Sequence, residues 1–81
     1  MIKLLYFAAL VDKLGQASEQ IDLPDNVSDV RGLVAMLKQR GGAWEEVFSH
    51  DALRITVNKQ FSELTTSIRN GDEVAFISAW L

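Results

Sequence analysis

The sequence predicts a single α+β domain in which a mixed sheet wraps one face around one main helix. Residues 2–8 and 73–77 are short and almost wholly apolar, which is typical of central strands covered on both faces. One strongly amphipathic helical segment lies between them. The chain has 81 residues, which fits one hydrophobic core, and we therefore expect residues 1–81 to form one domain with residues 78–81 as a C-terminal tail.

The first predicted strand covers residues 2–8. Side chains alternate across a strand, so Leu4 and Tyr6 would share one face and Leu5 and Phe7 the other. We expect Leu4 and Tyr6 to face the helix.

Two short elements should follow this strand. Residues 9–14 can form one helical turn, and Gly15 can end it in the left-handed conformation. Residues 19–23 alternate between polar and apolar, which predicts a half-buried strand closed by the turn residues 24–26.

The strongest helical signal comes next. Ser28 or Asn26 can cap the helix, and Asp29 places a negative charge near the positive end of its dipole. Gly41-Gly42 should stop it. The apolar stripe of this helix is formed by Val27, Val30, Leu33, Val34 and Leu37.

Residues 43–48 predict a second, short helix. Residues 53–57 alternate and predict a third strand, and Asn58-Lys59 can make a tight turn into a short extended piece at residues 60–62. The path from there to the last strand is expected to be irregular.

Leu64 and Ile68 should point inward from that irregular connection. Asn70-Gly71-Asp72 is a turn signal before the last strand, residues 73–77. The first and last strands are the most apolar, so we place them side by side at the centre of the sheet. A hairpin, one amphipathic helix and returning strands describe the β-grasp fold.

The composition argues against several classes of function. The net charge is −3 without a basic stripe, which disfavours nucleic-acid binding. There is no cysteine and one histidine, which leaves no disulfide, thiolate nucleophile or site of several Cys or His ligands for a metal. We interpret His50 as a solvated loop residue, and Asp22, Asp25 and Asp29 as strand-exit and capping residues.

The apolar run at residues 4–11 resembles the core of a signal peptide. Asp12 and Lys13 end it, no small-residue cleavage site follows, and a membrane span needs about 20 apolar residues. We expect a cytoplasmic protein without a membrane partner.

Three motifs carry a resemblance to a known family. They are residues 1–8 (MIKLLYFA), Val57-Asn58-Lys59 after the third strand, and Gly71-Asp72-Glu73-Val74-Ala75-Phe76 at the close. Together, and at this length, they resemble the small subunit of molybdopterin synthase, within the MoaD/ThiS-like sulfur-carrier family of ubiquitin-like β-grasp proteins. The likeness covers essentially the whole chain.

The resemblance implies a carrier that has no catalytic residues and binds no cofactor. In the family, an activating enzyme uses ATP to adenylate a C-terminal Gly-Gly, and sulfur transfer converts the carboxylate to a thiocarboxylate. The tail then enters the large synthase subunit and delivers sulfur for the molybdenum cofactor. The implied partners are the large subunit and the activating enzyme.

The sequence ends at Ala79-Trp80-Leu81, and the glycines of the family pattern would be the next residues. Leu81 as a terminus should block a channel gauged for glycine, because glycine alone has no side chain. The internal Gly41-Gly42 cannot substitute, since its carbonyl lies within a peptide bond.

Partner binding is expected on the outer sheet face and the tail. Phe7, Phe61 and Ile77 should form an apolar patch there, which is typical of a protein-docking surface. Trp80 and Leu81 could enter a partner pocket or pack back onto their own sheet.

Two alternative functions stay open at this point. The chain could be a β-grasp interaction module without carrier chemistry. It could also be a thiamin-pathway sulfur carrier, a family with the same fold and the same terminal glycines.

Overall fold

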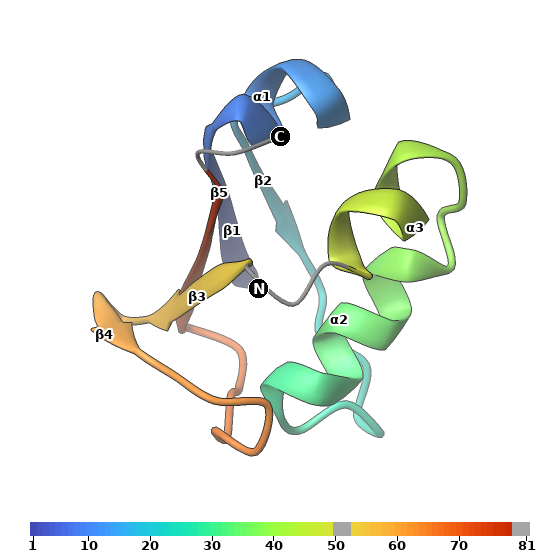
Figure 1. The fold of residues 1–81 in the computed structure, drawn as a ribbon. Coiled ribbons are helices and arrows are strands. Elements are labelled where there is room, and N and C mark those ends of the chain that lie inside the picture. The colour runs from blue at the N-terminus through green and yellow to red at the C-terminus, as the bar shows by residue number, and fades with distance from the viewer. Residues whose placement is uncertain (50–52, 79–81) are drawn as a thin grey trace.

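A computed structural model describes residues 1–49 and 53–78 of the chain (Figure 1). Its elements follow in the order β1 (Ile2–Ala8), α1 (Ala9–Leu14), β2 (Ser18–Ile21), α2 (Val30–Lys38), α3 (Ala43–Phe48), β3 (Arg54–Val57), β4 (Gln60–Phe61) and β5 (Glu73–Ser78). Within the described residues, no helix has the length and apolar character needed to cross a membrane.

The strands form one mixed sheet in the order β2-β1-β5-β3-β4. The first and last strands lie side by side at its centre and run parallel, in a register that pairs Leu4 with Val74 and Phe7 with Ile77. The other strand pairs are antiparallel. The prediction that the two most apolar strands are central neighbours is therefore confirmed, as is the β-grasp arrangement.

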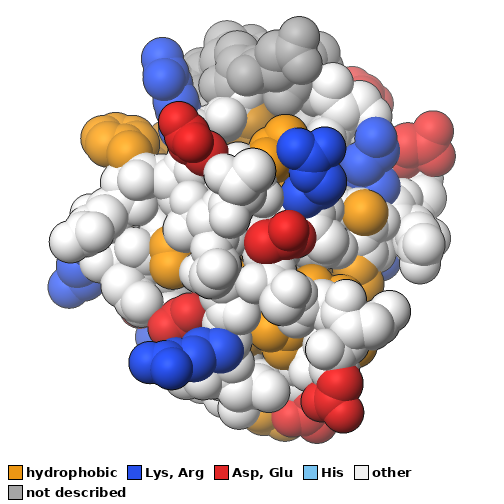
Figure 2. Space-filling model, turned by 90° about the horizontal axis from the view of Figure 1, so that it is seen from below, with side chains coloured by type: hydrophobic (Ala, Val, Ile, Leu, Met, Phe, Trp, Pro, Cys, Tyr) orange, Lys and Arg blue, Asp and Glu red, His pale blue; other side chains and the backbone are white. Residues whose placement is uncertain are grey.

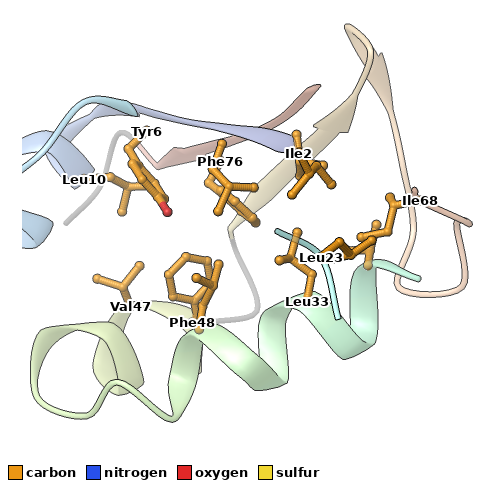
Figure 3. Packing of buried hydrophobic residues seen from close by; sticks show 13 residues of the cluster. Ile2, Tyr6, Leu10, Leu23, Leu33, Val47, Phe48, Ile68 and Phe76 are labelled. Carbon is orange, nitrogen blue, oxygen red and sulfur yellow. The ribbon is translucent and has the colours of Figure 1, made fainter. Parts of the chain in front are cut away.

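One face of this sheet packs on the helices. Figure 1 shows α2 and α3 on the same side of the strands, and no described helix covers the other side. Side chains from both layers meet in the core: Figure 3 shows Tyr6 and Phe76 pointing from the sheet toward Val47, Phe48 and Leu33 on the helices. The fully buried side chains include Ile2, Leu4, Tyr6, Leu10, Val30, Leu33, Leu37, Val47, Val74 and Phe76.

Aromatic side chains order the middle of this core. The rings of Tyr6 and Phe76 stack with centroids 5.7 Å apart, and Phe48 meets Phe76 edge-on at 5.0 Å. Such offset and edge-on pairs are favourable beyond their buried area. The apolar alternation of the two central strands thus gives the helices a fixed aromatic surface to pack on.

Most turns lie where their residues predicted them. Gly15 ends α1 with φ 77°, in the left-handed region that glycine adopts readily. Asn58 and Lys59 both have positive φ and connect β3 to β4 in the manner of a tight hairpin. The strand predicted at residues 19–23 is found at Ser18–Ile21.

The cap of α2 differs from the prediction. Asp29, and not Ser28 or Asn26, occupies the cap position: its backbone is extended and its carboxylate accepts a hydrogen bond from the Gly32 amide over 2.8 Å. The carboxylate thus both satisfies a free amide and sits at the positive end of the helix. The helix consequently begins at Val30.

The segment between β4 and β5 corrects a second expectation. Ile68 is buried as predicted, but Leu64 is 45% exposed. The backbone explains this, because the Arg31 amide donates to the Leu64 carbonyl over 2.9 Å and the Val30 amide donates to the Thr66 carbonyl over 3.0 Å. Carbonyls of this segment accept hydrogen bonds from free amides at the start of α2, and these bonds hold Leu64 on the surface.

Candidate functional site: the outer sheet face

The sheet face turned away from the helices carries two rows of side chains across the strands. The strand register places Phe7 beside Ile77 and Ile77 beside Arg54 in one row. The next row runs from Leu5 through Ala75 and Thr56 to Phe61, as set by the same pairings. Paired residues point to the same side of a sheet, so these residues share the outer face.

The two phenylalanines of this face are exposed. Phe7 is 45% exposed and Phe61 is 80% exposed, whereas the helix-facing residues of the central strands are almost completely buried. An exposed phenylalanine that lies beside further apolar side chains is typical of a protein-docking surface rather than of a core. We call Leu5, Phe7, Phe61, Ala75 and Ile77 the outer-face patch.

Phe61 lies at the far edge of this patch. It is on β4, three strands away from Leu5, or about 14 Å at the usual spacing of neighbouring strands. Phe7 and Ile77 are direct register neighbours. Phe7, Ile77 and Phe61 therefore share one face, as predicted. Phe7 and Ile77 form a close pair, whereas Phe61 lies apart at the sheet edge, with Thr56 and Arg54 on the strand between.

The patch adjoins the point where β5 ends. Ser78, assigned to the tail from the sequence, is the last residue of β5, lies opposite Ala8 and is 2% exposed.

Ala8 has φ 57° and ψ −133°, a conformation that favours glycine. Strained backbone of this kind tends to persist where the surrounding structure fixes it, and here it turns the chain from β1 directly into α1.

Three of the residues singled out from the sequence lie outside the described residues: Trp80, Leu81 and His50. The expected binding role of Trp80 and Leu81 and the loop role of His50 stay predictions.

The second and third sequence motifs meet in space. Asn58 Nδ2 donates to Asp72 Oδ1 and the Glu73 amide donates to Asn58 Oδ1, both over 3.0 Å. The Asn58 amide also donates to the Glu73 carbonyl over 2.7 Å. The Asn58 side chain thus ties the turn between β3 and β4 to the turn before β5, which fixes β3 against the strand that leads to the tail.

A polar network that the sequence analysis missed ties the hairpin to the helices. The Tyr6 hydroxyl donates to Glu19 Oε2 over 2.8 Å, and Arg40 donates to both Glu19 oxygens over 2.8 and 2.9 Å. The Arg40 guanidinium also lies 4.3 Å from the centre of the Trp44 ring. The sequence contained one signal for this network. Tyr6 was predicted to lie in the core, and a buried hydroxyl requires a hydrogen-bond partner.

The two acidic groups of this network have shifted pKa values. Hydrogen bonds from Arg40, aided by the Tyr6 hydroxyl, hold the pKa of the Glu19 carboxyl below its usual value. Burial, together with the hydrogen bond to Glu19, raises the pKa of the Tyr6 phenol. Both shifts favour the charged carboxylate and the neutral phenol near neutral pH. The network lies on the helix side of the sheet, because Glu19 is paired with the buried Leu4, and the outer-face patch lies on the other side.

The charges do not gather into a single-sign surface on the face in Figure 2, where basic and acidic side chains alternate with small apolar groups. Among the described residues, no three His, Cys, Asp or Glu side chains lie close enough together to hold a metal ion. The outer-face patch, with its two exposed phenylalanines, is the feature that best fits the predicted docking role.

Comparison with known proteins agrees with the fold and the sequence motifs. The model of the ThiS family matches residues 4–80. The molybdopterin synthase sulfur carrier subunit of Haemophilus influenzae is 28% identical over 76 residues, which cover 94% of this chain and 91% of that protein.

Solved structures show the same fold. SAMP1 from Haloferax volcanii superimposes with a TM-score of 0.78 at 23% identity, over 94% of this chain and 91% of that one. A Pyrococcus furiosus protein assigned as subunit 1 of a molybdopterin converting factor gives 0.74 at 26% identity, over 93% and 92% of the two chains.

Proposed function

Because this chain belongs to the ThiS family, we propose that it is a sulfur carrier and serves as the small subunit of a molybdopterin synthase. It docks through the outer-face patch and presents its C-terminal tail to the partner. The relative from Haemophilus influenzae, which carries this function in its name and aligns over most of both chains, supports the choice of pathway.

One structural observation carries the proposal. Strand β5 lies in the centre of the sheet, and its last outer-face residue before Ser78 is the half-buried Ile77, which is paired with the exposed Phe7. A partner that covers Phe7 and Ile77 therefore has Ser78, the end of β5, at the rim of its own contact surface. Docking and delivery of the carboxyl end are coupled by geometry, because a short tail cannot reach far from the strand that holds it.

The chemistry belongs to the end of the tail and to the partners. An activating enzyme joins the terminal carboxylate to AMP and releases pyrophosphate from ATP. A sulfide donor then attacks the acyl carbon, AMP leaves with the electron pair of the broken C–O bond, and the thiocarboxylate remains. In the synthase, that sulfur passes to a pterin precursor. The carrier itself contributes the surface that docks on the partner and a glycine-ended tail that is narrow enough to enter the partner's channel.

A chain with two glycines added after Leu81 tests this role. It is incubated with an activating enzyme of the family, ATP and a sulfide donor, and its intact mass is measured. We expect a mass increase equal to the replacement of one oxygen by sulfur, dependent on ATP. The 81-residue chain and a chain extended by Gly-Ala are the controls, and an unchanged mass of the Gly-Gly chain would contradict the carrier role.

The same protein can separate the two sulfur-carrier pathways. The thiocarboxylate form is offered to a molybdopterin synthase large subunit and, in a parallel reaction, to a thiazole synthase. Consumption of the thiocarboxylate with the large subunit supports the proposed pathway, and consumption with thiazole synthase alone would support a thiamin-pathway carrier instead.

A further inference from the structure

A groove lies on the helix side of the sheet, between α2 and the segment that follows β4. Its volume is about 520 Å³, which is within the usual range of ligand sites. Val34 and Ala35 of α2 line it together with Leu53 and Ile55 of the β3 region. Several of these side chains are only half-buried, so the groove presents apolar surface that the described residues leave uncovered.

Two basic side chains stand along the helix wall of this groove. Arg31 and Lys38 both line it and are seven residues apart on α2, or about 10 Å along the helix axis. Within the described residues, neither makes an ion pair, although Glu63 also lines the groove. The protein as a whole is acidic, with a net charge of −3, so two basic side chains beside apolar surface are a local feature.

The opposite side of the groove is held in place by the backbone. The Arg31 amide donates to the Leu64 carbonyl over 2.9 Å, and Ser62 pairs with the Ile55 carbonyl through its amide and its hydroxyl, both over 3.1 Å. These bonds anchor the segment to α2 at one end and to β3 at the other. Leu64 consequently stands exposed at the rim, where a bound chain could cover it.

We propose that this groove binds an acidic, aliphatic peptide segment of a partner protein. Aliphatic side chains would cover Val34, Ile55 and Leu64, and two carboxylates would pair with Arg31 and Lys38. The charge pattern favours this occupant, since among the described lining residues the two cations Arg31 and Lys38 outnumber the acidic Glu63. The site lies on the other side of the sheet from the outer-face patch, so both could be occupied at once.

The probe for this site is the peptide acetyl-Glu-Leu-Val-Leu-Glu-amide. In an extended strand its two leucines share one face and its two glutamates share the other. It is titrated into the ¹⁵N-labelled 81-residue chain while the amide chemical shifts are followed. We expect the shifts to concentrate at Arg31, Val34, Lys38 and Leu64, and the affinity to fall as salt is raised.

Charge reversal supplies the discriminating variants. Lys38→Glu and Arg31→Glu should each weaken binding at least tenfold, while Arg69→Glu, an exposed arginine outside the groove, should bind like the unmodified chain. Circular dichroism checks that each variant folds. The peptide with lysine in place of both glutamates tests the charge preference on the unmodified protein and should not bind.

Three outcomes would overturn the inference: no detectable binding, shifts centred on Phe7 and Phe61, or equal binding of the acidic and basic peptides. None of them bears on the sulfur-carrier role, because thiocarboxylate formation on the Gly-Gly chain is measured in a separate assay.

Discussion

The Tyr6 hydroxyl donates a 2.8 Å hydrogen bond to the Glu19 carboxylate. The Arg40 guanidinium donates to both oxygens of the same carboxylate, which thus joins strand β1 to Arg40. Tyr6 is 1% exposed, so its hydroxyl has little access to other partners. This contact connects the β1–β2 hairpin with the end of the main helix.

Replacing Glu19 by alanine should destabilise the domain by about 1–3 kcal/mol, because a buried hydroxyl loses its acceptor and Arg40 loses both hydrogen bonds. Urea unfolding measures the change. Glu45→Ala removes a carboxylate from an exposed position on α3 and should change stability by less than about 0.5 kcal/mol. Equal effects of the two substitutions would contradict a structural role for the network.

The same carboxylate predicts an acid-sensitive component of stability. The folded-state pKa of Glu19 lies below its unfolded value of about 4.3, so its contribution is fully present above that pH and is lost as pH falls through the lowered folded value. The urea midpoints of the unmodified chain and of Glu19→Gln should therefore differ at pH 7 and converge as the pH falls from the unfolded value through the lowered folded-state pKa. A difference that stays constant down to pH 2 would exclude Glu19 as its source.

The cap of α2 can be tested against the positions that the sequence suggested. Asp29→Ala should cost about 1 kcal/mol, because the Gly32 amide loses its acceptor at the positive end of the helix. Ser28→Ala should be nearly neutral, since no hydrogen bond of the Ser28 side chain is present in the described structure. The two variants are compared by thermal unfolding, and the reverse order of stability would place the cap at Ser28.

A pair of leucine substitutions tests which apolar residues support the core. Leu33→Ala should destabilise the domain by about 2–5 kcal/mol, because Leu33 is completely buried between α2 and the sheet. Leu64→Ala should cost well under 1 kcal/mol, since Leu64 is 45% exposed. Chemical unfolding measures both, and a large effect at Leu64 would mean that the segment after β4 packs more tightly than the structure shows.

The parts of the fold that the sequence predicted are those specified locally. The apolar runs of β1 and β5 mark central strands, the stripe on α2 marks its buried face, and the dipeptide Asn58-Lys59 marks a hairpin turn. Strand alternation also placed Phe7 and Ile77 on the outer face, as the register shows. In each case the pattern and the final packing agree.

The features that escaped prediction depend on contacts between distant segments. Asn26, Ser28 and Asp29 are all good cap residues, and only the extended backbone at Asp29 decides among them. Leu64 is held outward by a hydrogen bond to Arg31, and Glu19 meets Arg40 across 21 residues of sequence. Composition and periodicity contain no information on such pairings.

The rate of thiocarboxylate formation on Phe7→Glu, in the chain extended by Gly-Gly, tests the central claim that the outer-face patch docks a partner of the carrier, here the activating enzyme, and delivers the tail to it. A charge at Phe7, beside Ile77, should lower this rate at least tenfold, while Thr65→Glu, exposed on the segment after β4, should leave it unchanged. Unchanged circular dichroism shows that the variants are folded. A Phe7→Glu chain that acquires sulfur as fast as the unmodified one would contradict the account.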